Sequence, residues 1–197
     1  MSVTITAEEA NIPFPHDIDS ALSDVLVDWG ASLGTSHPTT TGTFSGTAAN
    51  SWPTLFGTAL SGTSYSYGDG VDYQFVVEGD LYYYFNETYT PSGLSPTPEQ
   101  HTVFGYATSL SLYTDADADG VADDLWLTID FSGVDLLDGA LSEGHAGELH
   151  QVIAGLQEGD PTALLAALDA RGIDGSDSIA NLIGTSLAAE SELLLAA

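Results

Sequence analysis

A long β-patterned region followed by a helical region limits the folds open to this chain. From Thr54 to Asp130, apolar and polar side chains alternate in short runs that glycines interrupt, which is typical of antiparallel strands. The triplets GDG (68–70) and EGD (78–80) have the composition of tight turns and predict hairpins between consecutive strands. Strands that precede helices without alternating with them indicate a single α+β domain, an antiparallel meander with helices packed on one face.

Outside this region, the spacing of apolar residues predicts one short strand and four helices. Apolar side chains recur every three or four positions, as on the buried face of a helix. The 197 residues are enough to bury one substantial core. The expected elements are a strand at 3–6, a helix at 20–34, a polar loop at 35–51, and helices at 145–159, 161–172 and from 178 onward.

The charge balance is extreme, because 29 acidic residues stand against one basic residue, Arg171, for a formal net charge of −28. Such a chain repels nucleic acid, anionic membranes and its own copies, so we expect no nucleic-acid partner and a monomer. The composition is typical of an exported protein or of a soluble protein from a high-salt cell. The absence of Cys excludes disulfides and thiolate metal sites, and no run of about 18 apolar residues predicts a membrane span.

Three consecutive tyrosines end one predicted strand, and a histidine opens the next. Because side chains alternate across a strand, Tyr83 faces one side of the sheet while Tyr82 and Tyr84 face the other. A phenol ionises near pH ~10, but one that donates its proton to His101 gains phenolate character, which suits ferric iron. The alternative is that the tyrosines pack across strands and that His101 is a surface residue.

Four separated segments resemble the HasA family of secreted bacterial haemophores, in the same order along the chain. The segments are FVVEGDLYY (75–83), HTVFGYATSLSL (101–112), GHAGELHQVIAGLQEGD (144–160) and ESELLLAA (190–197). The resemblance implies a curved antiparallel sheet backed by helices, and an extracellular haem carrier that catalyses no reaction. It also implies haem capture from haemoproteins and delivery to a TonB-dependent outer-membrane receptor.

The resemblance further implies a set of site residues. Tyr83 and His37 would be the axial ligands of iron in ferric haem b, and His101 would be the hydrogen-bond partner of the tyrosine. His37 is placed by WGASLGTSH (29–37), which is similar to the family's loop with one residue fewer. Alignment through the turn before the tyrosines selects Tyr83, whereas alignment on FNE (85–87) selects Tyr82.

The two ends of the chain bear on export. The N-terminus has neither a basic segment nor an apolar core, so no secretory signal peptide is predicted there. Residues 190–197 resemble the uncleaved C-terminal signal that an ABC-type exporter reads in type I secretion. We therefore expect a haem-binding domain at 1–189, a secretion tail at 190–197, and an extracellular location.

The acidic run TDADADGVADD (114–124) is a second candidate site. Carboxylates at alternating positions before Gly120 match the first half of a calcium-binding EF-hand loop, but Trp126 stands where a bidentate Glu is required. The run is therefore either a weak Ca²⁺ site or a solvated hairpin tip. The candidate Ca²⁺ ligands are Asp115, Asp117, Asp119 and Asp123. The alternative function is accordingly a calcium-stabilised, acidic secreted adhesion or matrix module without haem.

The remaining polar groups form no predicted site. The chain lacks a nucleophile elbow, a Walker loop, an HExxH motif and a dinucleotide fingerprint, so we expect no enzyme activity. His145 and His150 are five positions apart, which on one helix turns their side chains about 140° from each other. We interpret them as packing residues near the haem loops rather than as a metal-binding pair.

Overall fold

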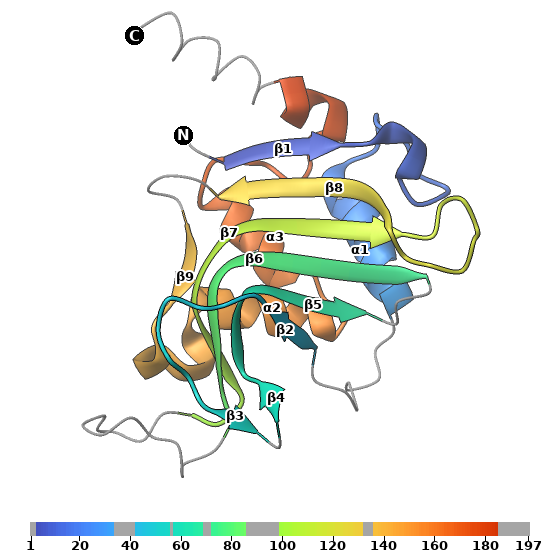
Figure 1. Ribbon diagram of the computed structural model, residues 1–197. Coiled ribbons are helices and arrows are strands. Elements are labelled where there is room, and N and C mark those ends of the chain that lie inside the picture. The colour runs from blue at the N-terminus through green and yellow to red at the C-terminus, as the bar shows by residue number, and fades with distance from the viewer. Residues whose placement is uncertain are drawn as a thin grey trace, which may run out of the picture.

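One curved antiparallel sheet organises the chain (Figure 1). The computed structural model describes residues 3–33, 42–55, 57–68, 72–85, 99–131 and 136–184. The strands are β1 (Val3–Ala7), β2 (Thr43–Ser45), β3 (Thr54–Leu55), β4 (Thr58–Ala59), β5 (Ser61–Gly68), β6 (Tyr73–Tyr84), β7 (Thr102–Thr114), β8 (Asp124–Phe131) and β9 (Leu137–Gly139). The seven-stranded sheet has the order β1-β8-β7-β6-β5-β2, with β9 paired to β7, while β3 and β4 form a separate hairpin.

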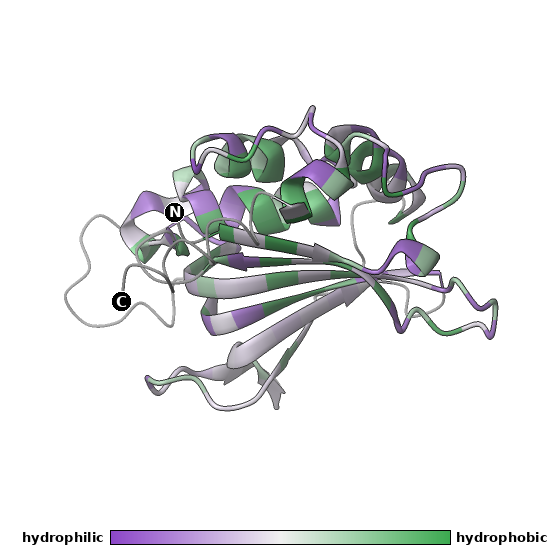
Figure 2. Cartoon of the chain, turned by 90° about the horizontal axis from the view of Figure 1, so that it is seen from above, coloured by the Kyte–Doolittle hydropathy of each residue, from purple (hydrophilic) through white to green (hydrophobic). Residues whose placement is uncertain are grey.

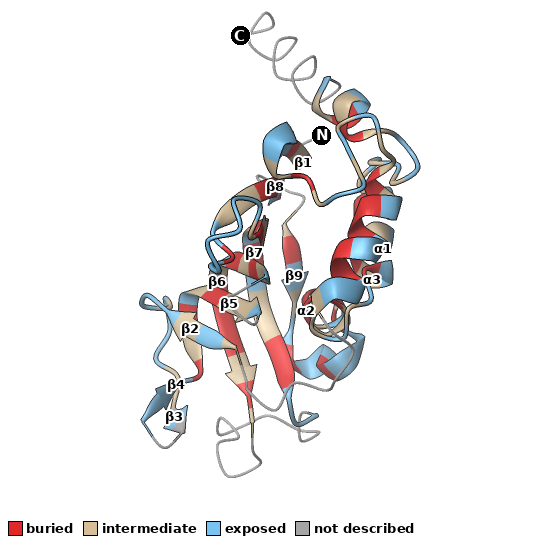
Figure 3. Ribbon diagram, turned by 90° about the vertical axis from the view of Figure 1, so that its right-hand side faces the viewer, coloured by how far each residue is buried: buried red, intermediate tan, exposed pale blue. Residues whose placement is uncertain are grey.

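The helices form a layer over one face of this sheet (Figure 2). They are α1 (Leu22–Leu33), η3 (Leu141–Ala146), α2 (Glu148–Gln157), α3 (Thr162–Asp169) and the helical residues 179–184. The short helix η1 (Glu9–Asn11) follows β1 at the edge of the sheet. The buried residues of α1 lie on the side toward the sheet (Figure 3), and among them Trp29 donates its Nε1–H to Tyr113 O of β7 at 3.2 Å. This arrangement confirms the predicted α+β domain with helices on one sheet face.

The predicted helical stripes form the core that joins the two layers. In α2, Leu149, Val152, Ile153 and Leu156 are all at most 1% exposed. Asp160 Oδ1 accepts the Thr162 N–H at 2.9 Å, which satisfies a free donor at the start of α3. Within the described residues, no helix is both long and apolar enough to cross a membrane.

Residues 78–80 do not form the predicted turn. They lie inside β6, where the pairing with β7 shifts register between Glu78 and Gly79. A Cβ on Gly79 would collide with Tyr106 O, so the glycine permits a close approach of the β7 backbone. The EGD triplet therefore marks a β-bulge within one continuous strand rather than the end of a strand.

Two short strands and one helix boundary also differ from the sequence-based expectation. β2 lies inside the predicted polar loop 35–51, and both β2 and β9 have three residues, too few to show an alternating pattern. The helix predicted at 145–159 begins instead at Glu148, because residues 141–146 form η3. Gly144, with φ 57, interrupts the helical backbone there.

Arg171 joins α2, α3 and the segment before β9. Its guanidinium makes a two-point contact with Glu148, at 2.8 Å to Oε1 and 2.7 Å to Oε2. It also donates to Ala167 O at 2.8 Å and to Leu136 O at 2.9 Å. The only Lys or Arg side chain in the sequence is therefore committed to holding the helices on the sheet.

Candidate functional site

The end of β6 and the residue before β7 meet at one end of the sheet. The two strands pair with Tyr83 opposite Val103, which brings His101 beside Tyr83. Tyr83 Oη and His101 Nδ1 lie 2.7 Å apart, and the ring of Phe85 packs edge-on against His101 with centroids 5.3 Å apart. The structure thus brings together the tyrosine and histidine that the sequence singled out, although residues 86–98 between them lie outside the described residues.

The surroundings of Tyr83 favour the protonated form of its phenol. Burial raises the pKa of Tyr83 above its ordinary value of 10.0. The neutral phenol is able to donate a hydrogen bond to His101 Nδ1 in the imidazole tautomer whose Nδ1 carries no proton. A positive charge at the phenol oxygen reverses the effect of burial, since it favours the phenolate.

The main chain of Tyr83 is fixed on the side away from β7. Its N–H donates to Leu60 O at 2.8 Å, and its carbonyl accepts the Trp52 Nε1–H at 2.9 Å. These bonds are independent of the Tyr83 side chain. The backbone that carries the phenol is therefore bonded on one side by β7 and on the other by Leu60 and Trp52.

Tyr82 occupies a different environment on the opposite face. Its side chain is 5% exposed, and its ring stacks on Phe104 with centroids 5.2 Å apart. Its hydroxyl donates to Asp80 Oδ2 at 2.8 Å and accepts the Asn50 N–H at 2.9 Å. Because these bonds already occupy the hydroxyl, the packing favours Tyr83 over Tyr82 as the tyrosine available to a ligand.

His145 and His150 do not diverge as predicted. Their rings stack, with centroids 4.4 Å apart and planes 11° apart. The prediction was wrong because it placed both residues on one helix, whereas His145 belongs to η3 and His150 to α2. His145 Nε2 donates to Gln100 O at 2.7 Å, and His150 Nδ1 accepts the Val103 N–H at 3.2 Å. The two histidines therefore bind the backbone just before and just after His101.

We expect His150 to reduce the stability of the fold in mild acid. Burial and the neighbouring His145 lower the pKa of His150 to about 4, while Glu99 acts in the opposite direction. Because the same ring titrates near pH ~6.5 in an unfolded chain, the unfolded state binds the proton first. The contribution of the neutral His150 ring to the free energy of unfolding is complete above pH ~6.5 and is lost as the pH falls from there toward 4. After allowance for solvent screening of this partly exposed ring, the loss is about 1 to 2 kcal/mol.

Urea unfolding at pH 7.5 and pH 5 measures this effect. In His150→Asn the titrating ring is gone while an acceptor for the Val103 N–H remains at the δ position. The wild type should lose more stability between the two pH values than the variant does. An equal loss in both proteins would contradict a titrating role for His150, because the many carboxylates of the chain are common to both.

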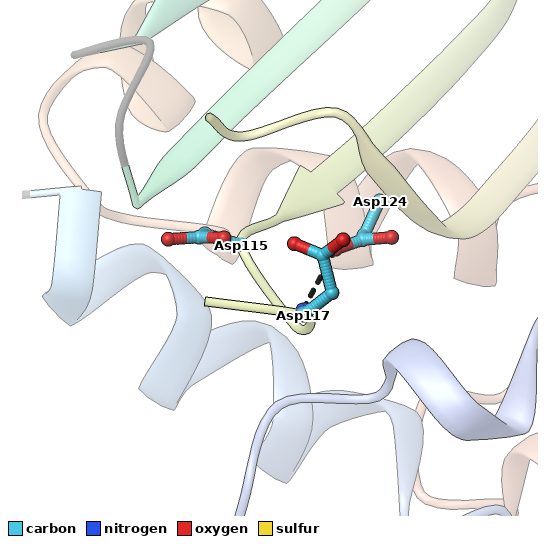
Figure 4. Close-up of side chains that lie close together, drawn as sticks. All are labelled: Asp115, Asp117 and Asp124. Carbon is cyan, nitrogen blue, oxygen red and sulfur yellow. Dashed lines mark hydrogen bonds between the residues drawn. The ribbon is translucent and has the colours of Figure 1, made fainter. Parts of the chain in front are cut away.

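The acidic hairpin tip lies at the opposite end of the sheet, between β7 and β8 (Figure 1). Carboxylate oxygens of Asp115, Asp117 and Asp124 lie within 4.8 Å of one another (Figure 4). These groups also bind the hairpin itself: Asp115 accepts the Asp119 N–H at 2.9 Å, and Asp124 accepts the Asp117 N–H at 3.0 Å. Of the predicted Ca²⁺ ligands, Asp119 and Asp123 lie outside this group in the described part of the chain, and Asp124 takes their place.

We expect Ca²⁺ to leave the thermal stability unchanged, because the backbone hydrogen bonds already account for the arrangement of these carboxylates. The test is thermal unfolding in EDTA and in about 1 mM Ca²⁺, the upper range for extracellular calcium modules. Asp124→Asn, which removes one carboxylate of the group, is the matched control. A rise in Tm with Ca²⁺ that disappears in this variant would show that the tip is a calcium site.

The model of the family described as heme-binding protein A (HasA) matches residues 1–197. The chain belongs to the HasA family. Apo hemophore HasA from Yersinia pestis is similar in structure, with 25% identity and a TM-score of 0.63 over 91% of this chain and 94% of that chain. Holo hemophore HasA from the same organism is similar at 24% identity and a TM-score of 0.63, over 91% and 95% of the two chains. Among curated proteins, none matches this chain significantly.

Membership of the HasA family confirms the resemblance carried by the four sequence segments. The family description names haem binding and no reaction, and it does not favour a calcium-stabilised adhesion module. The predicted ligand His37 lies in 34–41, outside the described residues, and so does the tail 190–197. Of the predicted haem-site residues, the structure thus describes Tyr83 and His101.

The contacts of Glu99, His145 and His150 with the residues around His101 were missed in the sequence. The missed signal was the pair of glycines Gly144 and Gly147, which flank His145 and favour a break before α2. Once that break is recognised, the argument that the two histidines diverge by helical spacing no longer applies.

Proposed function

We propose that this HasA family member is an extracellular protein that binds ferric haem, with Tyr83 as the principal ligand to iron. The observation that supports this most is the 2.7 Å hydrogen bond between Tyr83 Oη and His101 Nδ1. It pairs a half-buried phenol with a nitrogen that can accept its proton. A phenolate oxygen so formed is the kind of hard ligand that ferric iron accepts in haem proteins.

The residues at this end of the sheet fit a haem iron. Tyr83 offers an oxygen donor, and the ring of Phe85 provides a flat apolar surface next to Tyr83 and His101. Bound haem would supply a ferric iron whose positive charge favours phenolate over phenol. The donor set is therefore consistent with iron rather than with Zn²⁺ or Ca²⁺, which are usually bound by several protein ligands.

His101 makes the tyrosine a better ligand. Burial alone keeps the phenol protonated, because it raises the pKa of Tyr83. A hydrogen bond to His101 Nδ1 draws the proton away from the oxygen and leaves it partly phenolate in character. Hydrogen bonds of this kind orient a ligand and raise its basicity toward the metal.

His37 is proposed as the second axial ligand on the resemblance of residues 29–37 to the family's loop. The haem propionates would meet no free Lys or Arg side chain, since Arg171 is bound to Glu148. We expect them to face solvent or to accept hydrogen bonds from Ser, Thr and backbone N–H groups.

The wider role follows from the family and from the ends of the chain. Residues 1–189 would carry haem b, taken from haemoproteins, to a TonB-dependent outer-membrane receptor. Residues 190–197 would be the secretion signal that an ABC-type exporter reads. The net charge of −28 supports a monomer that stays soluble outside the cell.

Visible absorption during titration of the haem-free protein with ferric haem tests the function. We expect a saturable change in the Soret band at one haem per chain, together with a ferric phenolate charge-transfer band. Absence of a saturable change would overturn the haem-binding function. Saturation without the phenolate band would retain haem binding and reject Tyr83 as the ligand.

A further inference from the structure

We propose that Glu99, His145 and His150 are positioning residues, which hold segment 99–103 so that His101 Nδ1 reaches the Tyr83 phenol. This inference rests on the proposed function, in which that phenol binds iron. None of the three side chains needs to touch the haem. Their role is to fix where the hydrogen-bond partner of the ligand lies.

The residues before His101 are held by η3. The His145 N–H donates to Glu99 Oε2 at 2.7 Å. His145 Nε2 lies 2.7 Å from Gln100 O, and because a carbonyl only accepts, this nitrogen carries a proton. Backbone and ring of one histidine thus bind two successive residues that lead into His101.

The residues after His101 are held by α2. The Val103 N–H donates to His150 Nδ1 at 3.2 Å, so this nitrogen carries no proton. Thr102 Oγ1 donates to Glu99 O at 2.7 Å and closes the segment on itself. His101 therefore stands between two pairs of anchored residues.

His101 needs such anchors because its backbone is strained. Its φ of 63 lies in the left-handed region, which residues with a Cβ rarely adopt. Strained conformations of this kind persist where the surrounding contacts hold them. If the anchors were released, the backbone of His101 would relax toward negative φ and turn Nδ1 away from Tyr83.

Stacking couples the two anchors. The imidazoles of His145 and His150 lie face to face, with centroids 4.4 Å apart. Both hydrogen bonds fit the same neutral tautomer, with the proton on Nε2: His145 donates it to Gln100 O, and in His150 it leaves Nδ1 able to accept. Removal of either ring therefore loosens the other as well as its own hydrogen bond.

The test compares variants that remove the hydrogen bond of each histidine ring with variants that keep it. His145→Leu and His150→Leu delete the hydrogen bonds of the two rings at similar volume. His145→Gln keeps a donor at the ε position, and His150→Asn keeps an acceptor at the δ position. Glu99→Gln is a milder variant on the surface, which stays informative if a leucine variant fails to fold. His16→Gln, which alters a histidine that pairs with Asp28, is the matched control.

Two readouts separate positioning from general stability. In the haem-free protein, the ¹⁵N chemical shift of His101 Nδ1 reports its hydrogen bond to Tyr83. In the haem-bound protein, the rate of haem dissociation should rise about 10- to 100-fold in the leucine variants, the usual effect of losing a residue that orients a ligand. Both readouts should return toward the wild type in His145→Gln and His150→Asn, shift in the same direction but less in Glu99→Gln, and stay unchanged in His16→Gln.

The proposal is overturned if the leucine variants keep the wild-type His101 shift and dissociation rate. It is also overturned if each leucine variant and its polar counterpart lose both properties equally, in proportion to Tm, since that result indicates packing alone. If the wild-type protein binds no haem, the proposed function is refuted rather than the positioning role. The His101 shift in the haem-free variants would still decide whether these residues position it.

Discussion

Replacement of Tyr83 by Phe should lower the affinity for ferric haem by about 100-fold or more and remove the phenolate charge-transfer band. The change deletes one oxygen and keeps the ring, so the packing against Phe85 is retained. It also leaves His101 Nδ1 without its partner at 2.7 Å. Affinity would be measured by visible titration and by competition with a haem acceptor of known affinity.

Tyr82→Phe is the matched control, because it deletes the same atom one residue away. Here the hydroxyl bonds Asp80 and Asn50, so the loss should fall on stability, by about 1 to 3 kcal/mol, rather than on haem. The band should persist in this variant. Its loss in Tyr82→Phe and its survival in Tyr83→Phe would move the ligand by one residue, as alignment on FNE (85–87) predicts.

His37→Ala should weaken haem binding less than Tyr83→Phe does. The expectation follows from the hydrogen bond to His101, which strengthens the tyrosine as a ligand. Equal effects, or a larger one from His37, would refute Tyr83 as the principal ligand.

Arg171→Leu should lower the free energy of unfolding by about 2 to 4 kcal/mol. The side chain is 11% exposed, so its hydrogen bonds to Glu148, Ala167 O and Leu136 O form largely away from water. Leucine fills part of the space but leaves Ala167 O and Leu136 O without this donor. Urea unfolding followed by tryptophan fluorescence measures the change.

Glu148→Gln separates the charge from the hydrogen bonds. The Glu148 side chain is 37% exposed and can be hydrated, so its neutralisation should cost about 1 kcal/mol or less. A loss in Arg171→Leu below that of Glu148→Gln would contradict the role of the two backbone carbonyls. In that case the guanidinium would act only through its pair with Glu148.

The predictable part of the fold depended on long patterns. The buried stripe of α1 and the paired strands β5 to β8 run for many residues, so their periods are visible in the sequence. β2 and β9 are too short to show a period. Gly79 was misread because a glycine has the same composition signal at a bulge and at a turn, and only pairing with β7 distinguishes them.

Two features of the candidate site were predictable from the sequence: the alternation of the tyrosine side chains along β6, and His101 at the start of the next strand. Alternation places Tyr82 and Tyr83 on opposite faces, but the bond of Tyr82 to Asn50 depends on a loop that sequence spacing does not place. The stack of His145 on His150 depends on the break at Gly147, which turns two helical segments against each other. Such contacts arise from tertiary packing and leave no period in the sequence.

Resonance Raman spectroscopy of the haem-loaded protein, excited in the charge-transfer band, tests the central claim most directly. Vibrations of an iron-bound phenolate should appear in the wild type and in Tyr82→Phe, and should be absent from Tyr83→Phe. That result would identify the Tyr83 oxygen, hydrogen-bonded to His101, as the ligand to iron. Phenolate vibrations that persist in Tyr83→Phe, or that are absent from the wild type, would contradict it.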